Sequence, residues 1–365
     1  MSSALLELAD LDAVQDHFAA NGWGDGLPII PPTPERLAKF LAYVGRDGAE
    51  VIGHYTMRNR PITVEKLAIN AIMAGCLPEY LPVVIALVEC LLVPELNLHV
   101  ANSSTGSLTL GFIVNGPIRH QLAMNCHGNV LGPGNRANAT IGRALRLIQT
   151  NVMGSVAGAG AVLPHDLPVL DRSTIGHPAK YTAYHVVEDE EAFPDLVPVH
   201  VARGFDRQDS VVSAFAMGNH VMFSNHNEKT PEEWIASVAH YLVGAGRLTE
   251  FGYGVLLLPP ESAGLFIEAG WSKADMAKAL FDATRRSAAW VKRNGWKYGG
   301  RYVRGGPVEP GDEDRLLGIA GSPEELHIVI CGGPAGNFPT FLQTYAESFE
   351  VISRKITIPH EKGHI

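Results

Sequence analysis

Residues 124–146 hold the densest group of side chains that could do chemistry in this chain. Cys126 and His127 are adjacent, and a cysteine nucleophile needs a histidine or a helix N-terminus to lower the pKa of its thiol. The histidine usually comes from elsewhere in the sequence. Three more distant histidines are candidates for that partner: His120, His220 and His226. A buried, unreactive cysteine is the alternative interpretation.

The same segment predicts a site for an anion. Its glycines and proline form an irregular loop that can approach a ligand closely, and Asn135 or Asn138 can cap the helix that follows. One face of that helix carries four polar residues: Arg136, Thr140, Arg143 and Arg146. Guanidinium groups bind carboxylates and phosphates in a bidentate manner, so Arg143 is the predicted substrate clamp. A solvated basic face on a surface helix is the alternative.

Cys331 is the second candidate nucleophile. It ends an apolar run and precedes a Gly-Gly-Pro turn and a predicted helix start, where backbone N–H groups would lower its pKa. Gly332, Gly333 and Asn337 would then lie against the ligand. The remaining cysteines, at positions 76 and 90, lie within apolar helices and are interpreted as packing residues.

Histidines and carboxylates elsewhere leave a metal site open as an alternative. His220 and His226 are six residues apart, without the spacing of a known metal motif. An ordinary polar turn is the favoured interpretation. The acidic run 188–191 is either a solvated turn or the source of a general base, if its strand end faces the pocket.

Three stretches would position these side chains, at residues 111–117, 254–260 and 327–334. In each, an apolar strand runs into a Pro/Gly turn and a predicted helix. Such strands indicate a sheet buried on both faces, and open α/β sheets hold ligands at the carboxyl ends of their strands. Asn102 and Asn115, before and at the end of the first strand, are therefore predicted to bind substrate.

The order of elements predicts an α/β fold of two related halves. A helix opening at Pro78 precedes the first strand unit, and one opening at Pro231 precedes the second. The predicted domains are 1–160, an N-terminal α/β half with the Gly/Asn-rich loop, and 161–365, a β-rich connector plus a C-terminal α/β half. Two such halves would place a ligand at their junction.

Composition excludes several classes of protein. Hydrophobic residues make up 46% and charged residues 18% of the chain, as in ordinary globular proteins. The net charge of −9, without a basic stripe, argues against nucleic acid. The longest apolar run, 81–93, contains Glu89 and is shorter than the ~18 residues of a membrane span. The N-terminus lacks the features of a secretory signal, so we expect a cytoplasmic protein without a membrane anchor.

Longer motifs carry a resemblance. Residues 25–28 (DGLP), 31–36 (PPTPER) and 135–144 (NRANATIGRA) resemble those of a family of largely uncharacterised bacterial proteins, some associated with UGSC-motif (seleno)proteins. The resemblance extends over most of residues 20–200 and implies an enzyme-like α/β protein. It assigns no catalytic residues, and the Cys-Gly-Ser-Cys-like motif is absent, so thiol redox chemistry does not carry over to Cys331.

These observations favour a cofactor-independent hydrolase, or an enzyme of the lyase or hydratase type, that acts on a small anionic organic substrate. Two alternatives stay open: a metal-dependent hydrolase or lyase using His220 and His226, and a non-catalytic binding subunit of a two-component system. A homo-oligomer or a second protein subunit is compatible with either. The loops lack the order of glycines of a dinucleotide or nucleotide triphosphate site, so no such cofactor is expected.

Overall fold

The computed structural model describes residues 3–55, 60–156, 171–224, 227–245, 248–294, 305–343 and 350–359. The helices are α1 (Leu11–Ala20), α2 (Pro34–Val44), α3 (Val64–Ala74), α4 (Leu81–Leu91), α5 (Leu98–Ser103), α6 (Ile118–Gln121), α7 (Arg136–Asn151), α8 (Val199–Ala202), α9 (Pro231–Gly244), α10 (Pro260–Glu268), α11 (Lys273–Thr284) and α12 (Ala288–Asn294). The strands are β1 (Val51–Tyr55), β2 (Arg60–Thr63), β3 (Thr109–Asn115), β4 (Tyr184–Val187), β5 (Val211–Met217), β6 (Asn219–Met222), β7 (Gly254–Leu258), β8 (Arg286–Ser287), β9 (Leu316–Leu317), β10 (Leu326–Ile330), β11 (Thr340–Gln343) and β12 (Ile352–Lys355). The chain has the α/β fold that the sequence predicts.

Two four-stranded sheets share one strand pattern. Sheet 1 has the order β12-β5-β3-β4, and sheet 2 has the order β10-β7-β11-β6. In each sheet one central strand has a parallel edge neighbour, β4 beside β3 and β10 beside β7. On its other side lies an antiparallel strand, which in turn pairs with an antiparallel edge strand. The central strands are fully buried, as their apolar sequences predict.

Matching residues occupy matching places in the two sheets. Gly111 of β3 and Gly254 of β7 each leave room for a phenylalanine ring of the antiparallel neighbour, Phe215 and Phe341 respectively. His185 in β4 and His327 in β10 each pair with the residue that follows the glycine, and both are buried. Topology and residues together support the predicted relation between the halves.

The halves exchange edge strands. From β5 the chain continues through Gly218 into β6, which is the edge of sheet 2. In return, β12 follows β11 along the chain and forms the edge of sheet 1. The backbone N–H of Gly218 donates to the carbonyl of Gln343 (3.0 Å), and the Tyr253 hydroxyl bonds to both backbone groups of Ala216. The halves are therefore linked through continuous hydrogen-bonded structure.

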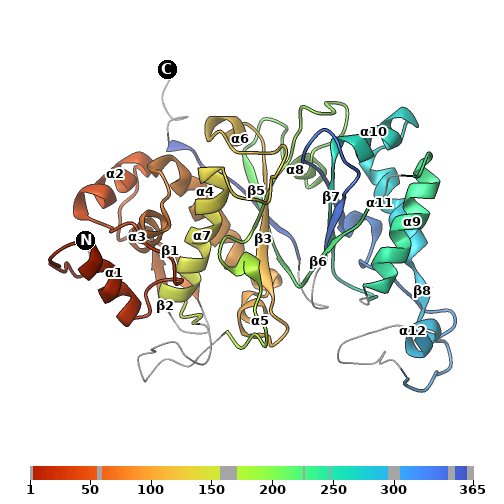
Figure 1. The fold of residues 1–365 in the computed structure, drawn as a ribbon, viewed down its shortest axis with the longest axis horizontal. Coiled ribbons are helices and arrows are strands. Elements are labelled where there is room, and N and C mark those ends of the chain that lie inside the picture. Colours follow the sequence, from red (N-terminus) through yellow and green to blue (C-terminus); the bar gives the residue numbers. More distant parts are fainter. Residues whose placement is uncertain are drawn as a thin grey trace.

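The two sheets lie between two groups of helices (Figure 1). Helices α2, α3, α4 and α7 bury their apolar faces in the larger core with sheet 1, and α9, α10 and α11 form a second core against sheet 2. One face of β7 belongs to each core: Val255 and Leu257 pack in the first, Leu256 and Leu258 in the second. Strands β4 and β5, in the predicted connector, complete sheet 1.

Local signals in the sequence explain several helix boundaries. The side chain of Thr33 accepts the N–H of Arg36, with Pro34 at the first helical position of α2. Thr63 caps α3 in the same way, and the left-handed Gly75 ends that helix.

One predicted element is wrong. No helix follows β10 in the described residues up to 343: the Gly-Gly-Pro turn leads into the antiparallel strand β11. The predicted β-rich connector also contains the short helix α8, which has Pro198 at its N-cap. Within the described part of the chain, no single helix is both long and apolar enough to cross a membrane.

Candidate functional site

Asparagine side chains build the loop that carries Cys126 and His127. Asn138, on the first turn of α7, accepts the backbone N–H of Asn125 (3.1 Å) and donates to its carbonyl (2.9 Å). The Asn125 side chain in turn accepts the N–H of His127 (3.0 Å) and donates to the carbonyl of Gly128 (3.1 Å). Asn138 was predicted to bind substrate; the structure instead shows its amide bonded to the loop, where it positions the residues that follow.

The second half holds the same loop from the other side. The N–H of Gly332 donates to the carbonyl of Cys126 (2.8 Å), and Gly332 pairs with His127 in a single parallel bridge. The N–H of Asp189, after β4, donates to the carbonyl of Ile330 at the end of β10 (2.8 Å). The parallel strands of the two sheets therefore end beside each other, at the junction where Cys126 lies.

Cys126, His127 and Asp189 bring a thiol, an imidazole and a carboxylate together. The Cys126 sulfur lies 3.8 Å from each ring nitrogen of His127, and His127 Nδ1 lies 3.2 Å from Asp189 Oδ2. The His127 side chain is 71% exposed, whereas that of Asp189 is 8% exposed. Burial raises the pKa of the Cys126 thiol to about 11; Asp189 adds to the rise and Arg119 opposes it.

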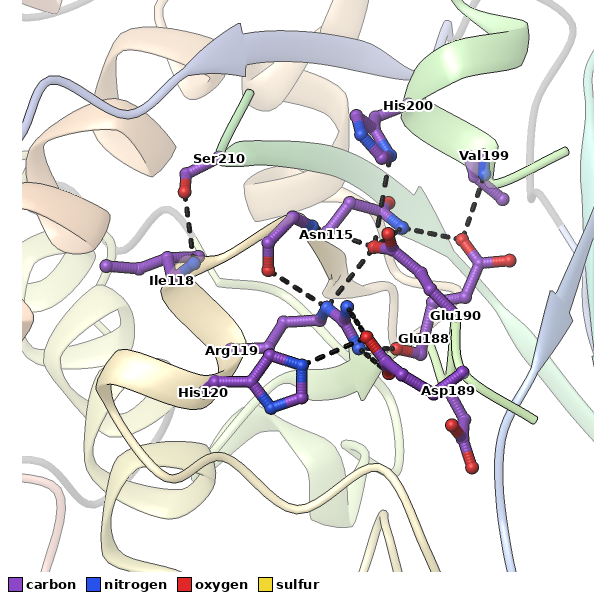
Figure 2. Close-up of polar contacts among 12 residues, drawn as sticks. Asn115, Ile118, Arg119, His120, Glu188, Asp189, Glu190, Val199, His200 and Ser210 are labelled. Carbon is purple, nitrogen blue, oxygen red and sulfur yellow. Dashed lines mark hydrogen bonds and ion pairs between the residues drawn. The ribbon is translucent and has the colours of Figure 1, made fainter. Parts of the chain in front are cut away.

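Arg119 lies at the centre of a buried network beside this group (Figure 2). Its side chain is 3% exposed, donates to the carbonyls of Gly116 (3.0 Å) and Glu188 (2.7 Å), and forms ion pairs with Glu190 and Glu191. The hydrogen bonds from Arg119 lower the pKa of Glu191 to about 2. Arg119 therefore locks the end of β4 onto the turn that follows β3.

Asn115 belongs to the same network. Its side-chain amide donates to Glu188 Oε2 (2.6 Å) and Glu190 Oε1 (3.1 Å). Glu188 also accepts the N–H of Val199 (2.9 Å) and forms an ion pair with Lys273 of α11. Asn115 therefore stabilises the acidic strand end, where the sequence predicted a contact with substrate.

The region around Cys126 is acidic. All four carboxylates of residues 188–191 lie at this strand end, and the permanent cations paired with them are Arg119 and Lys273. Figure 2 shows Asp189 pointing away from the Arg119 network; its Oδ2 lies beside His127, and its Oδ1 accepts the backbone N–H of Ala192 (3.1 Å). From the sequence, this run is a candidate source of a general base if its strand end faces the site. Asp189 of the run does lie beside His127. Arg119 and Lys273 were missed because no local pattern marks them.

Cys331 is a poor nucleophile in this structure. It is buried, and burial raises its pKa, with Glu188 and Cys126 adding to the rise. The predicted activation by a helix N-terminus is absent because β10 leads to a strand. Gly332 acts through its N–H bond to Cys126, and Gly333 lies close to the backbone of Gly128.

His220 lies away from the other candidates. It hydrogen-bonds the hydroxyl of Tyr184 (2.9 Å), which begins β4, whereas Asp189 follows the opposite end of that strand. Burial lowers the pKa of His220. It is therefore not a partner of Cys126 in this structure, and His226, its predicted companion at a metal, lies outside the described residues.

Arg143 already has a partner. Its Nε and Nη2 bond the two carboxylate oxygens of Asp25 (2.7 and 2.9 Å), and Nη2 also donates to the carbonyl of Pro28 (2.9 Å). Arg143 therefore makes with Asp25 the bidentate contact that was expected with a substrate. This corrects its predicted role as the substrate clamp. Arg136 donates to the carbonyl of Gly75 (2.9 Å), so it too binds backbone.

The remaining predicted ligand residues are dispersed. Asn135 caps α7 by accepting the N–H of Asn138 (3.0 Å), and the Thr140 hydroxyl donates to a carbonyl within that helix. Asn337 accepts the hydroxyl of Ser262 of α10 (2.5 Å). Asn102 lines a separate cavity beneath α7. None of these four side chains bonds Cys126, His127 or Asp189 in the described residues.

A comparison of the chain with protein-family models finds no match, and a comparison with curated proteins finds none either. The resemblance drawn from the sequence motifs therefore stays a prediction.

Proposed function

We propose that this protein is an enzyme in which Cys126 attacks a small carbonyl-bearing substrate, with His127 as general base and Asp189 as its orienting carboxylate. The observation that carries the proposal is the Cys126–His127–Asp189 arrangement at the junction of the halves. A nucleophile, a base and a group that orients the base are the shared requirement of such catalysis. Hydrolysis is the favoured reaction, and no cofactor takes part.

The raised pKa of Cys126 determines when its thiol loses the proton. The thiol is protonated at neutral pH, so it needs a base at the moment of attack. With Nδ1–H donated to Asp189, the other ring nitrogen of His127 is free to accept the thiol proton. The sulfur bonds to the carbonyl carbon, the bond to the leaving group breaks, and His127 returns the proton to that group. Water then releases the acyl group and restores the thiol.

The charges at the junction favour a neutral substrate. The anionic substrate expected from the sequence depended on the Gly-rich loop, its helix cap and the arginines, and the predicted clamp among them, Arg143, is bonded to Asp25. Near Cys126 four carboxylates face two cations, so an approaching anion would be repelled. An ester, thioester or amide without charge near its carbonyl fits these surroundings better.

Acetylation by p-nitrophenyl acetate tests the proposal. We expect wild-type protein to release p-nitrophenolate and to carry one acetyl group on Cys126, detected by peptide mass spectrometry. Cys126→Ala should abolish that acetylation, and Asp189→Asn should slow it by roughly 10²- to 10⁴-fold, because an amide replaces the carboxylate that fixes the His127 tautomer and stabilises its protonated ring. His240→Gln, an exposed histidine on α9, is the matched control for His127→Gln and should react like wild type.

Acetylation spread over lysines, or unchanged in Cys126→Ala and His127→Gln, would contradict the proposal. Circular dichroism and the melting temperature of each variant separate loss of function from loss of fold. A folded protein with no reaction toward esters or thioesters would favour the binding-subunit alternative.

A metal-dependent hydrolase or lyase is the second candidate, because one ligand atom each from Cys126, His127 and Asp189 lies within 4.8 Å of the others. Three such ligands with an open fourth position are the pattern of catalytic zinc sites. Titration with Co²⁺ tests this: thiolate-to-cobalt absorption that disappears in Cys126→Ser and persists in His220→Gln would place a metal here. Acetylation of Cys126 in the presence of a chelator would instead favour the metal-free reaction.

A further inference from the structure

A second polar site lies at the opposite end of sheet 1. A cavity of about 20 Å³ lies where β3 and β4 begin, beneath α7, and Thr109 and Ala183 belong to its wall. Thr109 and Asn115 are the two ends of β3, so the cavity is roughly 20 Å from the acidic strand end at ~3.3 Å per residue. It is therefore separate from the Cys126 site.

Two cations and one carboxylate line this cavity. Lys180 Nζ bonds both oxygens of Asp171 (2.8 and 2.7 Å) and the hydroxyl of Ser173. Arg146 reaches the same carboxylate through one longer contact, Nη2 to Oδ2 at 3.4 Å. Within the described residues, no other hydrogen bond of the Arg146 side chain is found. Counting only the described residues of the cavity wall, one positive charge is in excess, and most N–H groups of the Arg146 guanidinium have no acceptor among those residues.

Two buried amides add donors without acceptors. Asn102 and Gln149 are each 5% exposed and line the cavity. In the described residues, Nδ2 of Asn102 and Nε2 of Gln149 have no hydrogen-bond partner. Buried donors are almost always satisfied in folded proteins, so an acceptor is expected between them.

We infer that this cavity binds one carboxylate group, contributed by a small organic acid. A carboxylate offers two oxygens with several acceptor positions, and it matches the fork of Arg146 as well as single N–H groups from Asn102 and Gln149. The cavity has room for one or two water-sized groups, the space that two carboxylate oxygens would take. The excess positive charge is neutralised when the anion binds.

Titration with formate and butyrate, at constant ionic strength and with chloride as the comparison anion, tests this inference. We expect saturable binding of formate by calorimetry, with a rising melting temperature. Gln149→Glu supplies a carboxylate from the chain itself and should weaken formate binding by roughly tenfold or more, by repulsion and by occupying Arg146. Gln208→Glu, at an exposed position, makes the same change of charge and should bind like wild type.

Butyrate distinguishes the possible sources of the carboxylate. Binding of both formate and butyrate identifies an organic acid whose chain extends out of the cavity. Binding of formate alone identifies a free small ion. Absence of saturable binding, equal binding of chloride, or formate binding kept in a folded Gln149→Glu would overturn the inference. Asn102→Leu, which removes one donor and keeps the charge, provides a second variant and should also weaken binding. Acetylation of Cys126 should be unchanged in both variants, so this test is independent of the proposed reaction.

Discussion

The two halves of the molecule share a strand pattern and differ in what stands at the strand ends. Gly111 and His185 in sheet 1 correspond to Gly254 and His327 in sheet 2. Counting along the paired strands, Asp189 corresponds to Cys331. The first half ends in Asn115 and four carboxylates, whereas the second half has Leu258 in place of Asn115 and an Ile-Cys-Gly-Gly run, residues 330–333, in place of the carboxylates. The two halves therefore contribute different groups to the junction. The first half carries the polar side chains, and the second half makes backbone hydrogen bonds to the segments that carry them.

The largest effect expected from this difference is at Arg119. Arg119→Met should destabilise the protein by about 3–5 kcal/mol, because it leaves the buried Glu190 without its cation. The corresponding position in the second half is Ser262, and Ser262→Ala should cost only about 1 kcal/mol through its lost hydrogen bond to Asn337. Urea unfolding measures both.

Arg293→Met provides the control for Arg119, because its ion pair with Glu313 is exposed and should contribute less than about 1 kcal/mol. Equal losses for Arg119→Met and Arg293→Met would show that the polar strand end does not hold the first half together.

The glycine pair should behave alike in the two halves. In Gly111→Ala and Gly254→Ala the new methyl group meets the ring of Phe215 (2.3 Å) or Phe341 (2.2 Å), and each change should cost about 1–3 kcal/mol. Gly264→Ala, on α10 with open space around it, should be neutral or slightly stabilising. A large loss at one position and none at the other would weaken the case for related halves. Thermal and urea unfolding provide the comparison.

The histidine pair predicts a modest dependence of stability on pH. Burial lowers the pKa of His327 to about 3 and also lowers that of His185. Below about pH 6.5 the unfolded chain takes up protons that the folded chain excludes, so stability falls as the pH drops from 6.5 toward 5. Each histidine contributes at most about 1.4 kcal/mol per pH unit.

The test compares the free energy of unfolding at pH 7 and pH 5, a range in which histidines take up most of the protons. His327→Gln and His185→Gln should each reduce the difference, whereas the exposed His240→Gln should leave it unchanged. An undiminished difference in the double variant would refute the assignment.

Local structure could be predicted well from the sequence. Thr33 and Thr63 signal their helices through side-chain oxygen and spacing, and the apolar run 254–258 marks a buried strand. These features depend on residues a few positions apart. The Gly-Gly-Pro turn after Cys331 was misread because the same residues serve a turn into a strand as readily as a turn into a helix.

The site was only partly predictable because its members come from distant segments. Cys126 and His127 were identified from their residue types, but Asp189 reaches them only because β4 pairs beside β3 and ends against β10. Arg143 shows the opposite failure: its basic helical face was recognised, and its partner, Asp25, lies 118 residues away. A pattern along one helix does not reveal what stands opposite it.

The exchanged edge strands make the order of synthesis matter. Ser213 of β5 meets Ser353 of β12 across 140 residues, so β5 keeps an open edge until β12 has left the ribosome. Open edges of buried strands pair readily with other chains, and contacts this distant in sequence form slowly. A nascent chain of this protein therefore depends on protection of β5, and chains truncated before residue 350 should aggregate instead of folding as an independent first half.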